Sequence, residues 1–540
     1  MEQIKVENLT FKYPLSPKPA LTDINLTINE GEFVVLCGAT GSGKSTLLRL
    51  LKQEISPRGE MSGKVHLLGN DELTIRESAQ KIGFVVQNPA EQLVTDKVWH
   101  ELAFGLENLG CPPKIIAGRI AEIAGYFGIE EWYERPVAEL SGGQQQLLNL
   151  AAVMTMNPEI LILDEPSAQL DPIAASEFFT TLKKLNNDFA MTIIIAEHRL
   201  EELIPISDRL IIMENGKIKA NDSPEKVISL IDKSDNIFSA VPAASRLFIA
   251  LNGNALMQKC PLTIREGRDF IRRNYSNAVQ PAPCHEYSHS KNAALSFKNV
   301  FFRYERDSKD ILKDADICIY QNEIYSILGG NGSGKSTLLK LASGILKPYS
   351  GTIKVFDKKI KDYKGKSLYT DTLSLLPQNV QSLFSHNSVR EELADEDSYK
   401  NLPFDITGLL DSHPYDLSGG EQQLLALAKV LEKHPRILLM DEPTKGLDAE
   451  KKAALGRILK ELKSKGSTIV IVSHDVEFSA VYSDRCGLFF NGGIITENTP
   501  ELFFSENKYY TTAAARMSSG YYERTVTLDA LQDIINKNRN

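Results

Sequence analysis

The chain lacks the features of a membrane-spanning or disulfide-bonded protein. Apolar runs such as Ile160–Leu163 and Thr192–Ala196 are far shorter than the roughly 20 residues that a membrane helix needs. Its six cysteines are scattered and contain no C-x-x-C pair, which is typical of a reducing compartment. The net charge is -9, and this argues against a broad nucleic-acid-binding surface. Any membrane contact is therefore expected to come through partners.

Two glycine-rich stretches stand out, and each lies between an apolar run and an amphipathic segment. The first consists of Gly38, Ala39, Thr40, Gly41, Ser42, Gly43, Lys44, Ser45 and Thr46, and the second of Gly329, Gly330, Asn331, Gly332, Ser333, Gly334, Lys335, Ser336 and Thr337. Strand, glycine loop and helix form the context of a P-loop, whose backbone N–H groups converge on nucleotide phosphates. The pattern should occur by chance in roughly one or two of a hundred chains of this length. Two copies therefore predict two nucleotide sites.

The rest of the chain repeats in the same way. Tyr13 and Tyr304 are 291 residues apart, as are Gln87 and Gln378. The stretches LSGGQQQ (140–146) and LSGGEQQ (417–423) are 277 apart, as are ILILDEP and ILLMDEP. Between the glutamine and the LSGG stretch the second copy has 14 fewer residues than the first. The chain is a tandem duplication that is shortened in this one segment.

In each half, short apolar runs alternate with longer amphipathic stretches, which predicts an α/β fold with a largely parallel sheet. The region 4–28 has period-two character and predicts an antiparallel layer, and 87–140 predicts a helical subdomain. The expected domains are a nucleotide domain at 1–222, its helical tail at 223–271, a linker at 272–294, a nucleotide domain at 295–498 and a helical tail at 499–540.

With a P-loop, LSGG and DEP in this order, both halves resemble the nucleotide-binding domains of the ATP-binding-cassette family. The resemblance implies an α/β P-loop fold that binds ATP and Mg²⁺. It places Tyr13 and Tyr304 against adenine, although a half-buried strand tyrosine is the ordinary alternative. It also assigns a ligand set for Mg²⁺ in each half. These residues are Ser45, Gln87 and Asp164 in the first half and Ser336, Gln378 and Asp441 in the second.

The same resemblance implies which side chains are catalytic. Glu165 and Glu442 follow the aspartates and are expected to polarise the attacking water. His198 and His474 follow apolar strands, where a neutral imidazole can contact the γ-phosphate, although a lone histidine would more often be a surface residue. Gln87 and Gln378 also match the glutamine that links the site to the helical subdomain.

The LSGG stretches are expected to serve the opposite half. A serine that begins a helix exposes N–H groups that favour an anion, which in the family is the γ-phosphate of ATP on the other domain. The resemblance therefore implies two composite sites with no catalytic residue missing. The first P-loop would meet Ser418, Gly419, Gly420 and Asp448, and the second would meet Ser141, Gly142, Gly143 and Asp171.

A closer resemblance follows the first glutamine. QNPAEQL (87–93) and ELAFGLENLG (101–110) are similar to the ATPases of energy-coupling-factor (ECF) importers of prokaryotes, as are FKYP (11–14) and the tandem fusion. The family takes up vitamins, their precursors or transition-metal ions. Its ATPases are peripheral on the cytoplasmic face of the cell membrane, and their helical subdomain docks the partner. The partners implied are a transmembrane energy-coupling subunit and a small membrane-embedded substrate-binding subunit, with no nucleic acid.

Other functions stay open at this point. A twin-cassette ATPase acting on the ribosome shares the layout, but such proteins carry a long charged helical linker, and 222–294 has no sustained charge run. A nucleic-acid repair ATPase would need an inserted coiled coil or zinc module, and an exporter ATPase is disfavoured by the residues after Gln87. The sequence does not identify the cargo.

Overall fold

The computed structural model describes most of the chain, which divides into two compact units, Met1–Glu266 and Gly267–Asn540. Residues 15, 71–72, 169, 252–258, 276–291, 331, 365–366, 394–401 and 539–540 lie outside the described part. Each unit contains one P-loop. Within the described ranges, no helix is both long enough and apolar enough to cross a membrane.

The first unit is built on a six-stranded sheet in the order β5-β6-β7-β3-β8-β9. Its strands are β3 (Phe33–Cys37), β5 (Ile82–Val85), β6 (Ile160–Asp164), β7 (Thr192–Ala196), β8 (Arg209–Glu214) and β9 (Lys217–Asp222). All neighbours are parallel except β8 and β9. Every residue of β3, β6 and β7 is buried, because both faces of the sheet are covered by other elements. The predicted α/β fold is confirmed.

An antiparallel layer packs on this sheet. It consists of β1 (Glu2–Lys12), β2 (Leu21–Asn29) and β4 (Glu60–Leu67), in the order β2-β1-β4. Buried residues Ile4, Val6, Leu9 and Phe11 of β1 join one apolar cluster with Val34 and Leu36 of β3. The period-two pattern of the sequence therefore marks the face of β1 that packs toward the central sheet.

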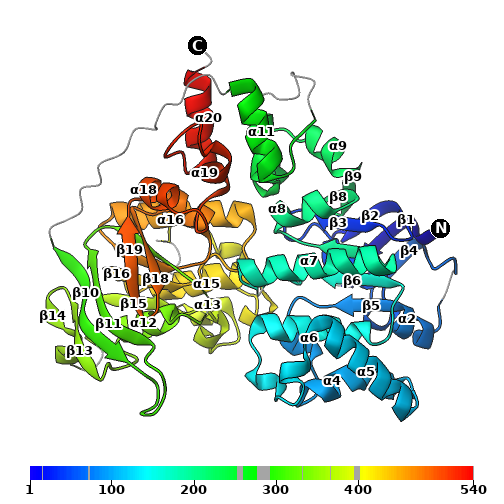
Figure 1. Ribbon diagram of the computed structural model, residues 1–540, viewed down its shortest axis with the longest axis horizontal. Helices are drawn as coiled ribbons and strands as arrows, with labels where there is room; N and C mark the ends of the chain where they lie inside the picture. The colour runs from blue at the N-terminus through cyan, green and yellow to red at the C-terminus, as the bar shows by residue number, and fades with distance from the viewer. Residues whose placement is uncertain are drawn as a thin grey trace. The chain divides into compact units, whose positions relative to one another are not determined.

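Helices of the first unit lie around the sheet, and three of them form a separate group. They are α1 (Lys44–Leu50), α2 (Ile75–Lys81), α3 (Pro89–Gln92), α4 (Val98–Asn108), α5 (Pro113–Phe127), α6 (Gly142–Met154), α7 (Pro172–Phe189) and α8 (Leu200–Leu203). In Figure 1, α4, α5 and α6 lie together beneath the sheet of this unit. Helices α4 and α5 fall within the helical subdomain predicted at 87–140, and α6, which follows it, belongs to the same group. Gly128 ends α5 with a φ of 66°, a conformation that glycine adopts without strain.

Short helices follow the last strand. The tail of the first half comprises α9 (Pro224–Ser229), the 3₁₀ helix η5 (Asn236–Ala240), α10 (Ala243–Ala250) and α11 (Ile264–Tyr275). Helix α11 continues to Tyr275, past the expected start of the linker at residue 272. Residues 276–291, which make up most of the expected linker, lie outside the described part of the chain.

The second unit repeats both sheets. The larger has the order β15-β16-β17-β12-β18-β19, with β12 (Ile324–Leu328), β15 (Leu373–Leu376), β16 (Ile437–Asp441), β17 (Thr468–Val472), β18 (Arg485–Phe490) and β19 (Gly493–Asn498). The antiparallel layer has the order β11-β10-β13-β14, with β10 (Ala293–Phe302), β11 (Leu312–Tyr320), β13 (Ser350–Val355) and β14 (Lys358–Lys359). The tandem duplication of the sequence is therefore a duplication of the fold.

The helices of the second unit differ from those of the first mainly in the subdomain. They are α12 (Lys335–Ala342), α13 (Val389–Glu392), α15 (Gly419–Leu431), α16 (Ala449–Ser464), α17 (Val476–Tyr482) and the tail helices α18 (Pro500–Glu506), α19 (Ala513–Ser518) and α20 (Leu528–Lys537). Helix α13 has four residues where α4 has 11, so the shortened segment of the sequence falls on the helical subdomain.

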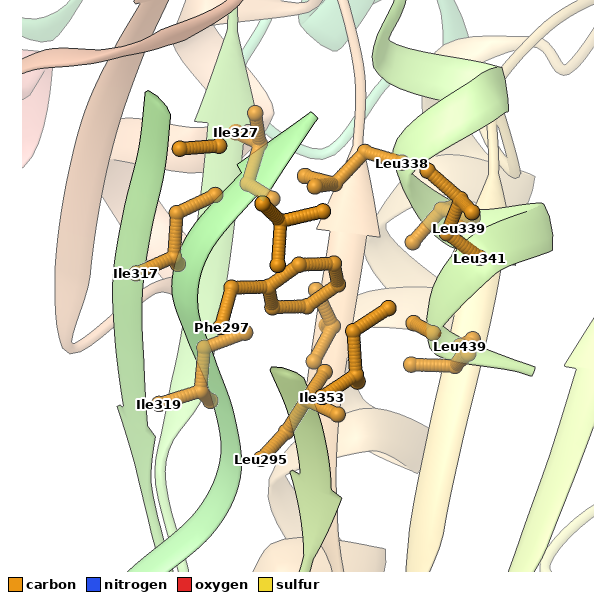
Figure 2. Close-up of a cluster of buried hydrophobic side chains, with 14 of the residues drawn as sticks. Leu295, Phe297, Ile317, Ile319, Ile327, Leu338, Leu339, Leu341, Ile353 and Leu439 are labelled. Atoms are coloured by element: carbon orange, nitrogen blue, oxygen red, sulfur yellow. The ribbon is translucent and has the colours of Figure 1, made fainter. Parts of the chain in front are cut away.

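Phe297 lies at the centre of the core between the two layers of the second unit. Figure 2 shows its ring among side chains of both sheets and of α12. The labelled neighbours are Leu295, Ile317, Ile319, Ile327, Leu338, Leu339, Leu341, Ile353 and Leu439. Only 4% of Phe297 is exposed, so its removal leaves a cavity that rigid strands on both sides cannot fill.

We expect Phe297→Ala to lower the stability of the second unit by about 3 kcal/mol or more, because it removes buried area and leaves a cavity. Phe490→Ala is the matched control, since 66% of Phe490 is exposed, and it should cost less than about 0.5 kcal/mol. Chemical denaturation of the full chain would measure both. Equal midpoints for the two variants would contradict this account of the core.

Candidate functional site

Four neighbouring parallel strands of the first unit deliver the sequence motifs to one edge of the sheet. In the order β5-β6-β7-β3, they are followed by Gln87, by Glu165 after the strand-end Asp164, by His198 and by the P-loop that begins at Gly38. Because the carboxyl ends of parallel strands share one edge, residues far apart in the sequence meet there.

The P-loop of the first unit holds its lysine over its own backbone. Lys44 is 4% exposed, and its Nζ donates to the carbonyl oxygens of Gly38 and Ala39 at 2.8 and 3.1 Å. A Cβ atom at Gly38 would lie 2.3 Å from the carbonyl oxygen of Met213, and φ at Gly43 is 99°. Glycine is therefore required at both positions, and the loop can fold tightly enough to direct N–H groups inward.

Two hydroxyl groups connect this loop to the neighbouring motifs. Ser45 Oγ donates to Asp164 Oδ1 at 2.9 Å, and the Tyr13 hydroxyl lies 3.2 Å from Thr46 Oγ1. Burial raises the pKa of Asp164, and the bond from Ser45 opposes that effect. The side-chain oxygen atoms of Ser45 and Asp164 thus lie together at the start of α1.

Glu165 is at the centre of a three-residue cluster. The Gln87 amide donates to Glu165 Oε2 at 3.0 Å, and His198 Nε2 lies 2.9 Å from Glu165 Oε1. The backbone φ of Glu165 is 46°, in the left-handed region that a glutamate rarely adopts. The equivalent Glu442 has a φ of 51°, so the strained conformation is repeated in both halves. Such strain is typical of functional positions.

The second unit repeats the P-loop contacts. Lys335 Nζ donates to Gly329 and Gly330 at 2.9 and 2.8 Å and lies 3.5 Å from His474 Nε2. The Tyr304 hydroxyl is 3.0 Å from Thr337 Oγ1. The Ser336 hydroxyl bonds to Asp441, whose pKa is raised by burial. The predicted P-loop residue Asn331 lies outside the described residues.

Glu442 has different surroundings from its counterpart Glu165. His474 Nε2 lies 3.1 Å from Glu442 Oε1, and the His474 backbone N–H donates to Oε2 at 3.3 Å. Burial raises the pKa of Glu442 to about 7. Gln378 follows β15 at the same edge of the sheet and is exposed.

The signature serines precede helices and form capping boxes with Gln144 and Glu421, each three residues later. Ser141 Oγ accepts from the Gln144 N–H at 3.3 Å at the start of α6. Ser418 Oγ instead donates to Glu421 Oε2 at 2.6 Å at the start of α15. Gly142 and Gly143 open α6, and Gly419 and Gly420 open α15.

The two predicted aspartates after the DEP motifs also cap helices. Asp171 Oδ1 accepts from Ala174 N at 2.8 Å at the start of α7, and Asp448 Oδ1 accepts from Lys451 N at 2.9 Å at the start of α16. A Cβ atom at Gly143 would lie 3.4 Å from Ala174 Cβ, so the signature helix and α7 begin side by side.

Glu197 is a residue of the first site that the sequence did not reveal. It is 2% exposed, and its carboxylate accepts from the Ser167 N–H at 2.8 Å and the His198 N–H at 3.0 Å. It thus joins the loop after Glu165 to the loop of the histidine. The corresponding residue of the second unit is Ser473, whose Oγ lies 3.5 Å from Thr444 Oγ1. The sequence feature that could have indicated Glu197 is a charged residue directly after the apolar run of β7.

Comparison with known proteins identifies the family. The sequence model described as ABC transporter matches residues 21–168 and 312–445, which together are just over half of the chain. The chain belongs to the ABC transporter family.

Relatives of this ABC protein share its full layout. It is 40% identical over 526 residues to a protein of Bacillus thuringiensis, covering 95% of this chain and 94% of the relative. It is 32% identical to a protein of Methanosarcina mazei, covering 93% and 90%. Both are named as ABC transporter ATP-binding proteins. The family implies that the chain binds and hydrolyses ATP.

Two solved structures are also similar. The archaeal ribosome recycling factor aABCE1, solved with the ribosomal stalk protein aP1, matches with a TM-score of 0.59 at 20% identity, covering 92% of this chain and 91% of that one. At this identity the likeness shows the fold alone. The other is cbiO1 of Clostridium perfringens, part of the ABC transporter complex cbiONQ, at a TM-score of 0.40 and 31% identity, covering 43% and 92%.

The raised pKa of Glu442 predicts a pH-dependent cost to folding. Between its ordinary pKa of 4.5 and about 7, the folded chain binds the proton more tightly than the unfolded chain, so stability falls as pH rises through this window. Glu442→Gln removes this fall. The free energy of unfolding of the variant relative to the wild type should therefore increase by up to about 3 kcal/mol between pH 5 and pH 8. Denaturant unfolding of the nucleotide-free chain at both pH values would measure it. Parallel curves for variant and wild type would contradict the shift.

Proposed function

We propose that the chain is the ATP-hydrolysing subunit of an ECF-type importer. It is peripheral on the cytoplasmic face of a prokaryotic membrane, and its cargo is a vitamin, a vitamin precursor or a transition-metal ion. ATP binding draws the two halves together, hydrolysis releases them, and the helical subdomain passes the motion to a transmembrane partner. The observation that carries the ATPase part is the cluster of Gln87, Glu165 and His198 beside the P-loop.

The P-loops fit a triphosphate. Ser42 Oγ and Ser333 Oγ are buried with no hydrogen-bond partner among the described residues, so each P-loop holds an unsatisfied polar group that a phosphate oxygen can bond. Each lysine ammonium already lies over the loop backbone and adds positive charge there. Tyr13 and Tyr304 offer an aromatic ring for adenine, and 55% of Tyr304 is exposed.

The donors beside each P-loop also fit Mg²⁺. Hydroxyl, carboxylate and amide oxygens are hard ligands of the kind that this ion prefers, and Ser45, Asp164 and Gln87 provide them in the first half. In the second half, Asp441 Oδ1 is buried and has no hydrogen-bond partner among the described residues, which a cation would relieve. Ser336 and Gln378 complete that set. Bound Mg²⁺ neutralises charge on the phosphate oxygens.

The glutamates are the groups that we assign to the attacking water. In the first half, the Gln87 amide and the His198 imidazole hold the two carboxylate oxygens of Glu165, so its orientation is set before ATP arrives. In the second half, Glu442 must be ionised to accept a proton. With a pKa of about 7, a substantial fraction of this carboxyl group is ionised at neutral pH. His198 and His474 are placed to contact the γ-phosphate.

We further propose that each signature stretch serves the nucleotide of the other half. Ser141 would act with the second P-loop and Ser418 with the first, with Asp171 and Asp448 alongside them. The capping geometry supports an anion at α6, because Ser141 Oγ accepts a bond and keeps its own proton for donation. The N-terminal end of a helix also favours negative charge.

The helical subdomain of the first half supports a membrane partner. Val94 is 60% exposed, Phe104 40% and Ile115 47%, and all three lie on or beside α4 and α5. We expect the proposed partner to cover these apolar side chains. The residues after Gln87 that resemble ECF ATPases lead directly into this region.

Loss of the glutamates should stop hydrolysis and spare binding. We expect Glu165→Gln combined with Glu442→Gln to lower kcat at least roughly 100-fold, because neither half can polarise water, while ATP still binds. Lys44→Ala combined with Lys335→Ala should instead abolish ATP binding, since the P-loop charge is lost. Steady-state ATPase assays and fluorescent-nucleotide binding would measure both pairs. Full hydrolysis by the glutamine pair would contradict the assignment.

Membrane partners can be tested directly. Affinity purification of the chain from detergent-solubilised native membranes, followed by mass spectrometry, should recover a polytopic membrane protein and a small membrane-embedded binding protein in stoichiometric amounts. Phe104→Glu should reduce that recovery by placing a charge on an exposed apolar position of the subdomain. The matched control is Phe490→Glu at the end of β18, where the phenylalanine is 66% exposed. Recovery of ribosomal subunits without a membrane protein would instead favour the ribosomal alternative.

A further inference from the structure

The same hydrogen bond ties the tail of each half to the helix that follows its histidine. In the first unit, Glu201 Oε2 accepts from the Ala243 N–H at 2.8 Å. In the second, Glu477 Oε1 accepts from the Ala513 N–H at 2.7 Å. Each glutamate is the third residue after its histidine, and each alanine is the first residue of a tail helix, α10 or α19.

The bond is retained although the intervening chain differs. Glu201 and Ala243 are 42 residues apart, whereas Glu477 and Ala513 are 36 apart. The first residues of a helix have N–H groups without partners inside the helix, and a serine, threonine or aspartate next to them usually accepts the bond. Helix α10 is preceded by Pro242, which has no such side chain, so the carboxylate of Glu201 caps it from a distant element.

Apolar packing reinforces this connection in the second unit. One buried cluster contains Leu328, the last residue before the P-loop, together with Ala480 of α17 and the tail residues Phe503 and Phe504. A Cβ atom at Gly330 would lie 3.9 Å from the Tyr510 hydroxyl, which places the tail beside the P-loop itself. The tail therefore contacts both the strand that enters the P-loop and the helix that leaves the histidine.

The first unit has the equivalent arrangement. A cavity of about 130 Å³ lies between Gly38–Ser42 of the P-loop, the β8–β9 turn, Lys219 and Ile237 of the tail helix η5. Lys219 Nζ bonds to Asp235 Oδ1 at 2.8 Å, one residue before η5 begins, and so fixes the tail on this side. Both tails thus lie against the nucleotide-binding edge of their own unit.

We propose that Glu201 and Glu477 are positioning residues through which each tail holds the histidine loop of its own half. The inference rests on the proposed ATPase function. Each of these two glutamates is the third residue after a histidine. The Nε2 of that histidine lies 2.9 or 3.1 Å from the glutamate that we assign to the attacking water. Loss of the cap frees α8 or α17 at its first turn, so the imidazole is held less well at the moment of hydrolysis.

The test uses the full chain and compares two kinds of tail cap. Glu201→Ala combined with Glu477→Ala should lower kcat roughly fivefold, the size expected for loss of a helix cap, with KM for ATP unchanged. Gln at both positions should restore kcat, because its amide oxygen still accepts the bond. The control is Glu266→Ala, which removes an equivalent cap on Leu262 and Thr263, at 2.8 and 3.1 Å, in a part of the tail not bonded to α8.

Combining the alanine pair with loss of the histidines separates a positioning role of the two glutamates from a purely structural one. If the glutamates act through the histidines, the alanine pair should lower kcat no further on a His198→Ala, His474→Ala background. Hydrogen exchange of 196–203 and 472–479 gives a readout that needs no hydrolysis, and it should speed up in the alanine pair and not in Glu266→Ala. Unchanged exchange, or an equal loss of kcat in the control, would overturn the inference. A wild-type chain that hydrolyses no ATP would overturn the proposed function instead.

Discussion

The structure depends on one constraint, the parallel packing of strands that are buried on both faces. Because β5, β6, β7 and β3 run in the same direction, the loops that follow them must meet at one edge. Each loop carries one polar motif, and the surrounding helices keep water from the strands beneath. The strained backbone at Glu165 and Glu442 lies at this edge, where the sheet on one side and the histidine on the other hold it in place.

Duplication preserved this edge and changed its surroundings. Both halves keep the lysine over the P-loop, the hydroxyl beside the aspartate and the histidine beside the glutamate. The first half adds the bond from Gln87 and the buried carboxylate of Glu197, whereas the second has Ser473 at that position. The second half also has the shorter helical subdomain. The two halves therefore have similar chemistry at the nucleotide edge and different surroundings.

Each tail contacts the nucleotide-binding edge of its own unit. In both halves the first N–H of a tail helix bonds to a carboxylate on the helix after the histidine. In the second half the neighbouring Thr512 also caps α19, at the Ala515 N–H. Apolar contacts place the second tail against the strand that enters its P-loop. A change at the nucleotide edge can therefore reach the tail through the carboxylate bond in both units. In the second unit it can also do so through apolar packing.

The sequence by itself determined the duplication, the α/β class, the antiparallel layer and the family, because the motifs combine local backbone requirements with fixed spacing. Gly38 and Lys44 could be assigned from their neighbours alone. Only the tertiary structure decided the environment of Glu442, whose pKa depends on burial by distant segments, and the partners of Glu197, Glu201 and Glu477. The bonds Ser167–Glu197, Glu201–Ala243 and Glu477–Ala513 join residues that are 30 to 42 positions apart, and hydrogen bonds over such distances leave no periodic trace in the sequence.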